Sequence, residues 1–251
     1  MIEIILDEKS WCENVLSSFS MGSSPTSTLN RLAKYYHSIG YRRSEIGRLL
    51  EEFILRCNPS ANIMRWQDVI DNCVRHSDRR PLISIDGIPI TKSELSKIGA
   101  LPGTMLRRLM FTLLCLAKYR NTVNDRNDGW VSYENRDIFK IANVQTTRLR
   151  QYAMMNDLLR AGYIGMSKIV DNVSVRVTMI EEDDDIAIRV TDFRNLGNQY
   201  SNYIAGGYIE CAHCGLTVKR NSSAQKYCKD CAYDMKLCWS PGASKVTTNA
   251  A

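Results

Sequence analysis

Leu158-Leu-Arg-Ala-Gly-Tyr-Ile164 is the stretch of sequence that decides the fold of the central part of the chain. Before it, residues 146–161 carry apolar side chains at helical spacing, and Gly162 follows where a C-cap glycine would end the helix. Two β-branched, alternating runs come next, on either side of the hairpin-type turn Asp171-Asn172, at residues 163–170 and 173–180. The sequence therefore predicts a helix that leads directly into a two-stranded hairpin.

The residues before this helix predict three further elements. From Thr104 on, apolar residues recur at spacings of three and four, which indicates a buried helix. Turn formers at residues 124–129 follow it, residues 130–133 predict a short strand, and residues 135–142 predict a short helix. The expected order from Gly103 to Ile180 is helix, strand, helix, helix and hairpin.

This order, together with the leucine, glycine and apolar pair quoted above, resembles the winged-helix family over about 78 residues. In that family the N-terminal half of the last helix enters the DNA major groove, and the hairpin contacts the backbone or the minor groove. The resemblance implies groove-facing roles for Gln145, Thr146, Thr147, Arg148, Arg150 and Gln151. Arginine and glutamine can pair with guanine and adenine edges, and threonine can reach phosphate or a thymine methyl group. The wing candidates are Lys168 and Arg176.

Winged helices also serve as protein-docking modules, and the local charge leaves this alternative open. Residues 134–162 contain five basic and three acidic side chains, a weak excess for a DNA reader. The acidic run Glu181-Glu-Asp-Asp-Asp185 would lie just beyond the wing, where it would repel phosphate. We interpret it as a solvated loop before a strand at residues 186–190, with a carboxylate metal site as the less favoured alternative.

Nine cysteines are an unusual number for a chain of 251 residues. Their odd count argues against a disulfide framework, because thiols stay reduced where no export signal directs a chain outside the cell. The cysteines fall into two groups. Five of them crowd into the last fifth of the sequence, and the four scattered ones are expected to be core or helix-face residues: Cys12, Cys57, Cys73 and Cys115.

Cys211-Ala-His-Cys214 and Cys228-Lys-Asp-Cys231 are two CxxC pairs separated by thirteen residues. Four thiolates at this spacing make the closed tetrahedral shell of a structural Zn²⁺, and metal binding would supply the folding free energy of so small a module. The four positions resemble the zinc-ribbon and treble-clef fingers at the end of many bacterial and phage proteins. We expect His213 and Cys238 to lie outside the ligand set.

The charge of this predicted finger argues against a role as a phosphate clamp. Residues 210–236 contain five basic and three acidic side chains, a net charge of +2. Four thiolates with one Zn²⁺ add about −2, which makes the module nearly neutral. The resemblance to zinc-ribbon and treble-clef fingers implies a structural or protein-binding role instead.

The N-terminal third predicts three helices, at residues 28–38, 44–57 and 66–76. A hairpin is predicted at residues 81–90 around Asp86-Gly87, followed by a short helix that Thr91 and Glu94 begin as a capping box. Four arginines of this region are candidate phosphate contacts: Arg42, Arg43, Arg79 and Arg80. A solvated helical face or helix-terminal charge is the alternative interpretation.

Together these patterns predict a mainly α fold with small β elements. The expected layout is a helical N-terminal domain with a hairpin near its end, a winged helix with an additional strand, a connector, a four-cysteine finger and a disordered tail. These parts are assigned in that order to residues 1–102, 103–191, 192–207, 208–238 and 239–251.

Motifs of enzymes and membrane proteins are sparse. The sequence has no GxxxxGK, HExxH or GxSxG motif, and no GxGxxG after a strand. We therefore predict a protein that is not an enzyme, with a carboxylate two-metal nuclease as the alternative left open. The longest apolar run, residues 109–117, is too short to span a bilayer, and acids occur in residues 1–8 where a secretory signal would be basic. A cytoplasmic location is expected.

The net charge of +6 permits a polyanionic partner. Our first hypothesis is a protein that binds double-stranded DNA, with no membrane or small-molecule ligand. Its order of modules resembles replication-associated or regulatory proteins of bacterial phages and mobile elements. The alternative is an interaction factor whose winged helix and finger dock on a host polymerase, replication or defence complex.

Overall fold

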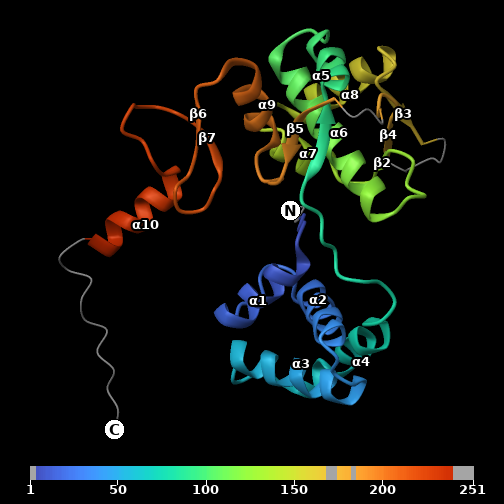
Figure 1. Ribbon diagram of the computed structural model, residues 1–251, viewed down its shortest axis with the longest axis vertical. Helices are drawn as coiled ribbons and strands as arrows, with labels where there is room; N and C mark the ends of the chain where they lie inside the picture. The colour runs from blue at the N-terminus through green and yellow to red at the C-terminus, as the bar shows by residue number, and fades with distance from the viewer. Residues whose placement is uncertain (1–3, 168–173, 182–184, 240–251) are drawn as a thin grey trace. The chain divides into compact units, whose positions relative to one another are not determined.

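The computed structural model describes residues 4–167, 174–181 and 185–239 (Figure 1). In these ranges the chain is mainly α-helical with three small sheets, as the sequence predicts. It divides into two compact units, residues 3–87 and the chain from Ile88 onward, so the boundary falls before the predicted one at residue 102. None of the described helices is long and apolar enough to cross a membrane.

The first unit is a bundle of helices around one apolar core. Its elements are α1 (Glu8–Ser18), α2 (Pro25–Ser38), α3 (Arg43–Cys57), a 3₁₀ turn η1 (Ile63–Arg65) and α4 (Gln67–His76). Each helix turns its apolar face inward, and Cys12 and Cys73 are buried in the core among leucine and isoleucine side chains, as predicted. Helix α1 was not predicted. The Asp7 carboxylate begins it by accepting hydrogen bonds from the backbone N–H groups of Lys9 and Ser10.

A buried carboxylate fastens α1 into this unit. The Glu8 side chain accepts hydrogen bonds from Lys34 Nζ at 2.8 Å and from the backbone N–H of Ile83 at 2.9 Å. Arg31 Nε lies 3.4 Å from the other Glu8 oxygen. Because a buried charge is tolerated only when it is paired and hydrogen-bonded, Glu8 links α1, α2 and the end of the unit.

The predicted hairpin at residues 81–90 is wrong. Strand β1 (Ile88–Thr91) pairs antiparallel with β5 (Ile186–Val190), and Ser84 instead forms an isolated bridge with Asp7. The alternating pattern correctly predicts a strand, but it does not predict which segment pairs with that strand. Asp86-Gly87 lies at the boundary between the two units, and does not turn the chain back on itself.

The predicted capping box is present at the start of α5 (Lys92–Gly99). The Thr91 hydroxyl accepts the backbone N–H of Glu94, and the Glu94 carboxylate accepts the backbone N–H of Thr91 at 2.9 Å. The same carboxylate is fully buried and receives Lys118 Nζ, 2.9 Å from both oxygens. Glu94 therefore also ties α5 to the long helix α6 (Thr104–Val123).

Helix α6 is the centre of the second unit. It packs against α5, β1 and the elements that follow it (Figure 1), and most of its apolar residues are buried. The following elements appear in the predicted order, and β2, β4 and β3 form an antiparallel sheet in the order β2-β4-β3. Their bounds are β2 (Trp130–Val131), α7 (Asn135–Ile141), α8 (Arg148–Arg160), β3 (Ile164–Met166) and β4 (Val175–Val177).

Helix α8 ends as its sequence predicts. Gly162 has a φ of 78°, and the backbone N–H of Tyr163 donates to the carbonyl of Leu158 at 3.0 Å. This bond closes the last turn and directs the chain into β3. The predicted hairpin turn Asp171-Asn172 lies outside the described residues.

The predicted connector at residues 192–207 is mostly a packed helix, α9 (Leu196–Ala205). Leu196 is fully buried, and the Tyr200 ring packs on Phe111 of α6 with 5.3 Å between ring centroids. After α9 come β6 (Tyr208–Glu210), β7 (Thr217–Lys219) and α10 (Lys229–Trp239), which together form the finger. Of the predicted tail, residues 240–251 lie outside the described residues.

Candidate metal centre and nucleic-acid interface

Two local structures bring the four predicted cysteines together. Cys211 and Cys214 lie in the turn between β6 and β7, where Gly215 has a φ of 73° and donates its N–H to the Cys211 carbonyl at 2.8 Å. Cys228 precedes α10 and Cys231 lies in its first turn. The left-handed backbone at Gly215 explains why a glycine follows the first pair.

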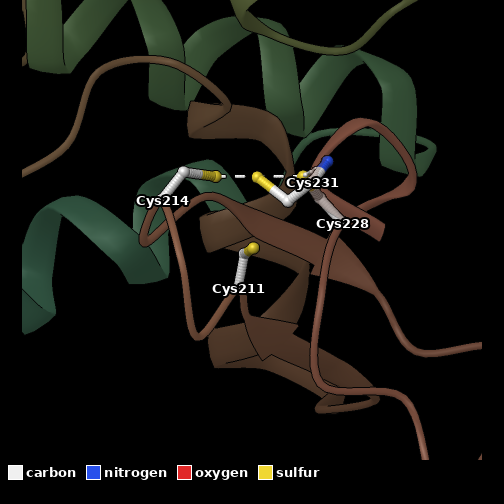
Figure 2. A group of neighbouring side chains, drawn as sticks. All are labelled: Cys211, Cys214, Cys228 and Cys231. Atoms are coloured by element: carbon white, nitrogen blue, oxygen red, sulfur yellow. Dashed lines mark hydrogen bonds between the residues drawn. The ribbon is translucent and has the colours of Figure 1, made fainter. Parts of the chain in front are cut away.

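The spacing of the sulfur atoms fits a single metal ion. All four Sγ atoms lie within 4.8 Å of one another, and Cys214 Sγ is 3.8 Å from Cys228 Sγ. Figure 2 shows the four side chains converging from the turn and from the helix start. In a tetrahedral site with Zn–S bonds of about 2.3 Å, neighbouring sulfurs are about 3.8 Å apart. The cluster is therefore a candidate metal centre that needs little rearrangement to close around an ion.

The charge states of these thiols also favour a cation. Burial alone would raise the pKa of Cys211, but backbone N–H groups of Cys214, Cys228 and His213 bring that pKa down to about 6. A hydrogen bond with Cys228 and burial raise the pKa of Cys231 above its usual range. Four thiolates in so small a space repel one another, so a bound dication is what would let them ionise together.

His213 lies beside the cluster without completing it. Its Nδ1 atom is 3.4 Å from Cys231 Sγ, and its side chain is exposed. The four sulfurs already supply a full tetrahedral set, so His213 is a neighbour of the ligands, as predicted. The Cys238 side chain lies outside the described residues.

Hydrogen bonds from α6, from α9 and from Arg194 just before α9 hold the finger in place, and sequence reasoning missed all of them. Arg194 Nη2 donates to the Cys214 carbonyl at 2.6 Å, Asn198 Nδ2 donates to the Thr217 carbonyl at 3.1 Å, and Arg108 Nη2 donates to the Tyr208 hydroxyl at 2.8 Å. These residues are distant in the sequence from the cysteines. No local pattern could have identified them.

Helix α8 begins with the side chains that were predicted to face DNA. Arg148 and Arg150 are exposed at its start. The guanidinium of Arg148 lies over the Tyr152 ring, 5.7 Å from the centroid, and its Nη2 is 3.2 Å from the hydroxyl. Thr147 accepts the Arg150 backbone N–H at 3.3 Å, so it caps the helix. The other candidates differ in exposure: Gln145 is exposed, and Thr146 and Gln151 are half-buried.

A groove between α7 and the start of α8 adds two basic residues that the sequence reasoning did not select. Arg136 and Lys140 of α7 line it together with Gln145, Thr146 and Gln151, and no acidic residue is part of the lining. Both cations are exposed. Their spacing of four places them on one face of α7, which is the signal that could have found them.

Of the two wing candidates, the structure describes only Arg176. Arg176 of β4 donates to the carbonyl of Asp128 and pairs with its carboxylate at 2.6 Å, so much of its charge is neutralised locally. Asp128 adopts a φ of 48°, in a loop that precedes β2. Lys168 lies outside the described residues.

The four N-terminal arginines are all exposed in the first unit. Arg43 pairs with Asp78 at 2.6 Å, and this contact brings Arg43 close to the chain just before Arg79 and Arg80. The backbone N–H of Arg42 donates to Glu45, as expected at a helix start. The ion pair with Asp78 compensates the charge of Arg43, whereas the guanidinium groups of Arg42, Arg79 and Arg80 remain at the surface.

Comparison with family models, curated proteins and solved structures found no match for this chain.

Proposed function

We propose that residues 103–180 form a winged helix and that the protein binds double-stranded DNA through the start of α8. The observation that carries this proposal is the surface of α8. Arg148 and Arg150 project from its first turn beside a groove that contains Arg136 and Lys140 and no acidic residue. Such a concentration of cations and amide side chains at a helix start suits phosphate contacts and base-edge contacts together.

The arrangement of the second unit supports the winged-helix part of the proposal. The helix-strand-helix-helix-hairpin order and the β2-β4-β3 sheet agree with the layout that the sequence resemblance implies. In that layout α8 is the recognition helix, and β3 and β4 form the base of the wing.

We also propose that the four cysteines hold one structural Zn²⁺. The sulfur spacing and the all-thiolate ligand set support zinc in a structural role. The second cysteine pair begins a helix, which favours a treble-clef finger over a zinc ribbon. The order of the modules supports a cytoplasmic role in phage or mobile-element replication or regulation.

The double variant Arg148→Ala/Arg150→Ala tests the DNA proposal. We expect its affinity for a labelled random-sequence duplex at low salt to fall at least about tenfold, because each lost base or phosphate contact costs roughly 1–3 kcal/mol. Fluorescence anisotropy measures the affinity. Circular dichroism should show an unchanged fold, since Arg148 and Arg150 are exposed.

The matched control is Arg65→Ala/Arg160→Ala, which removes the same charge from two exposed residues that belong neither to the first turn of α8 nor to the groove lining. We expect the affinity of this control for DNA to change by less than about twofold, after correction for the general effect of removing two positive charges from the protein. Equal losses in both double variants would show that only net charge matters. An unchanged affinity in the first variant would refute the assignment of α8.

One observation favours the interaction-factor alternative. Leu149 is 82% exposed and Tyr152 is 45% exposed, on the same turn of α8 as the arginines. An exposed leucine next to an aromatic ring is common at protein-docking surfaces. If the wild-type protein does not bind DNA, these two side chains are the first to test against a protein partner.

A further inference from the structure

A second basic hollow lies where the finger meets α6 and α9. It has a volume of about 700 Å³. Arg108 of α6, Lys219 of β7 and Lys229 of α10 line it together with amide and tyrosine side chains, and the lining contains no carboxylate but includes Cys228 of the candidate metal centre. Neither the predicted DNA-binding residues nor the metal centre accounts for these three cations.

Hydrogen bonds to neighbouring elements of the fold hold the Arg108 side chain in place in this hollow. Its Nε donates to the Ser201 hydroxyl at 2.7 Å and its Nη2 donates to the Tyr208 hydroxyl at 2.8 Å. Both partners are neutral, so they orient the guanidinium and leave its charge uncompensated. A fixed cation between a helix and the finger is well placed to receive an anionic ligand.

This hollow adjoins the groove at the start of α8. Asn143, in the turn between α7 and α8, lines both cavities. Arg136 and Lys140 line the groove, and Arg108, Lys219 and Lys229 line the hollow. The two cavities thus share Asn143 as a common wall residue, and each contains basic side chains.

We infer that this hollow binds the phosphate backbone of the DNA that α8 contacts. This inference rests on the proposed DNA-binding function and extends it to the finger. The near-neutral net charge of the finger predicted a poor phosphate clamp, but net charge ignores position. Lys219 and Lys229 share a hollow with Arg108, so three cations gather there beside the single thiol of Cys228, although the whole module is nearly neutral.

The test is the double variant Lys219→Gln/Lys229→Gln in the full-length protein. Both side chains are exposed, so the fold should persist. We expect the affinity for a labelled random-sequence duplex to fall roughly fivefold or more at low salt, and the slope of log K against log salt to become shallower by about 2. The control Lys226→Gln/Arg160→Gln removes equal charge outside the hollow and should leave the slope nearly unchanged.

The outcomes separate this inference from the proposed function. If the wild type shows no salt-dependent binding, the DNA proposal fails and the inference fails with it. If the wild type binds and the Lys219/Lys229 variant has the wild-type affinity and slope, the inference alone is overturned. Elemental analysis provides a further check: loss of zinc from the variant would show that the two lysines serve the metal centre, which would also overturn the inference.

Discussion

Removal of the metal is expected to unfold the finger and to leave the rest of the chain folded. In the described part of the finger, only Cys211, Thr217 and Cys228 are buried, so apolar packing cannot hold it together. Structural Zn²⁺ binding by four thiolates contributes on the order of 10 kcal/mol or more to such modules. Treatment with a strong chelator should therefore remove the protection of residues 208–239 from proteolysis, while α6 and its neighbours stay resistant.

The variant Cys228→Ser should give the same result without a chelator, with zinc content well below one equivalent by elemental analysis. Cys57→Ser is its matched control, because Cys57 is half-buried in the first unit and is not part of the metal-binding group found among the described residues. It should retain full zinc content. Freshly folded wild-type protein that holds less than about half an equivalent of zinc after dialysis would contradict the four-thiolate site.

Replacement of Gly197 by alanine is expected to destabilise the second unit strongly. A Cβ atom at this position would lie 1.7 Å from the carbonyl oxygen of Ala142 and 2.5 Å from its carbon. Because these atoms belong to the backbone of Ala142, they cannot rotate away as a side chain could, and α9 must move away from the turn between α7 and α8. That movement would break the hydrogen bond of 2.7 Å from Asn143 to Asn198. We expect a loss of about 3 kcal/mol and a Tm lower by roughly 6–12 °C in thermal unfolding.

Gly99→Ala is the control for this substitution. Gly99 is the last residue of α5, and a Cβ there would meet nothing within 4 Å. Its Tm should stay within about 2 °C of the wild type, because alanine at such a site has a small effect of either sign. If Gly197→Ala also stays within that range, the close packing of α9 against the α7–α8 turn is refuted.

Local signals account for the parts of the fold that the sequence predicts well. The glycine after Leu158-Leu-Arg-Ala161 ends α8, Thr91 and Glu94 form the capping box, and the two CxxC pairs converge in one cluster. Each of these signals acts over a few residues, so backbone geometry and hydrogen bonding decide the outcome locally. The convergence of the two cysteine pairs reaches further along the chain, and it agrees with the shared metal site that their repeated spacing predicts.

Partners that lie far apart in the sequence explain most of the errors. Strand β1 was assigned a hairpin partner, but its partner is β5, about one hundred residues away. The connector proved to be α9 because Leu196 and Tyr200 pack on α6, and α1 was missed because its anchor, Glu8, bonds Lys34 and Ile83. Arg176 pairs with Asp128, a contact that no local pattern predicted. An alternating or charged pattern indicates which kind of structure or interaction a residue favours. Which partner the residue has depends on tertiary contacts with distant parts of the chain.

The salt dependence of DNA binding tests the central claim most directly. Affinity of the full-length protein for random-sequence duplex DNA would be measured across a series of salt concentrations. The account predicts detectable binding at low salt and a linear log–log plot with a slope of about −4 or steeper, since Arg136, Lys140, Arg148 and Arg150 each neutralise a phosphate or approach one. Undetectable binding at low salt, or an affinity that does not change with salt, would contradict it.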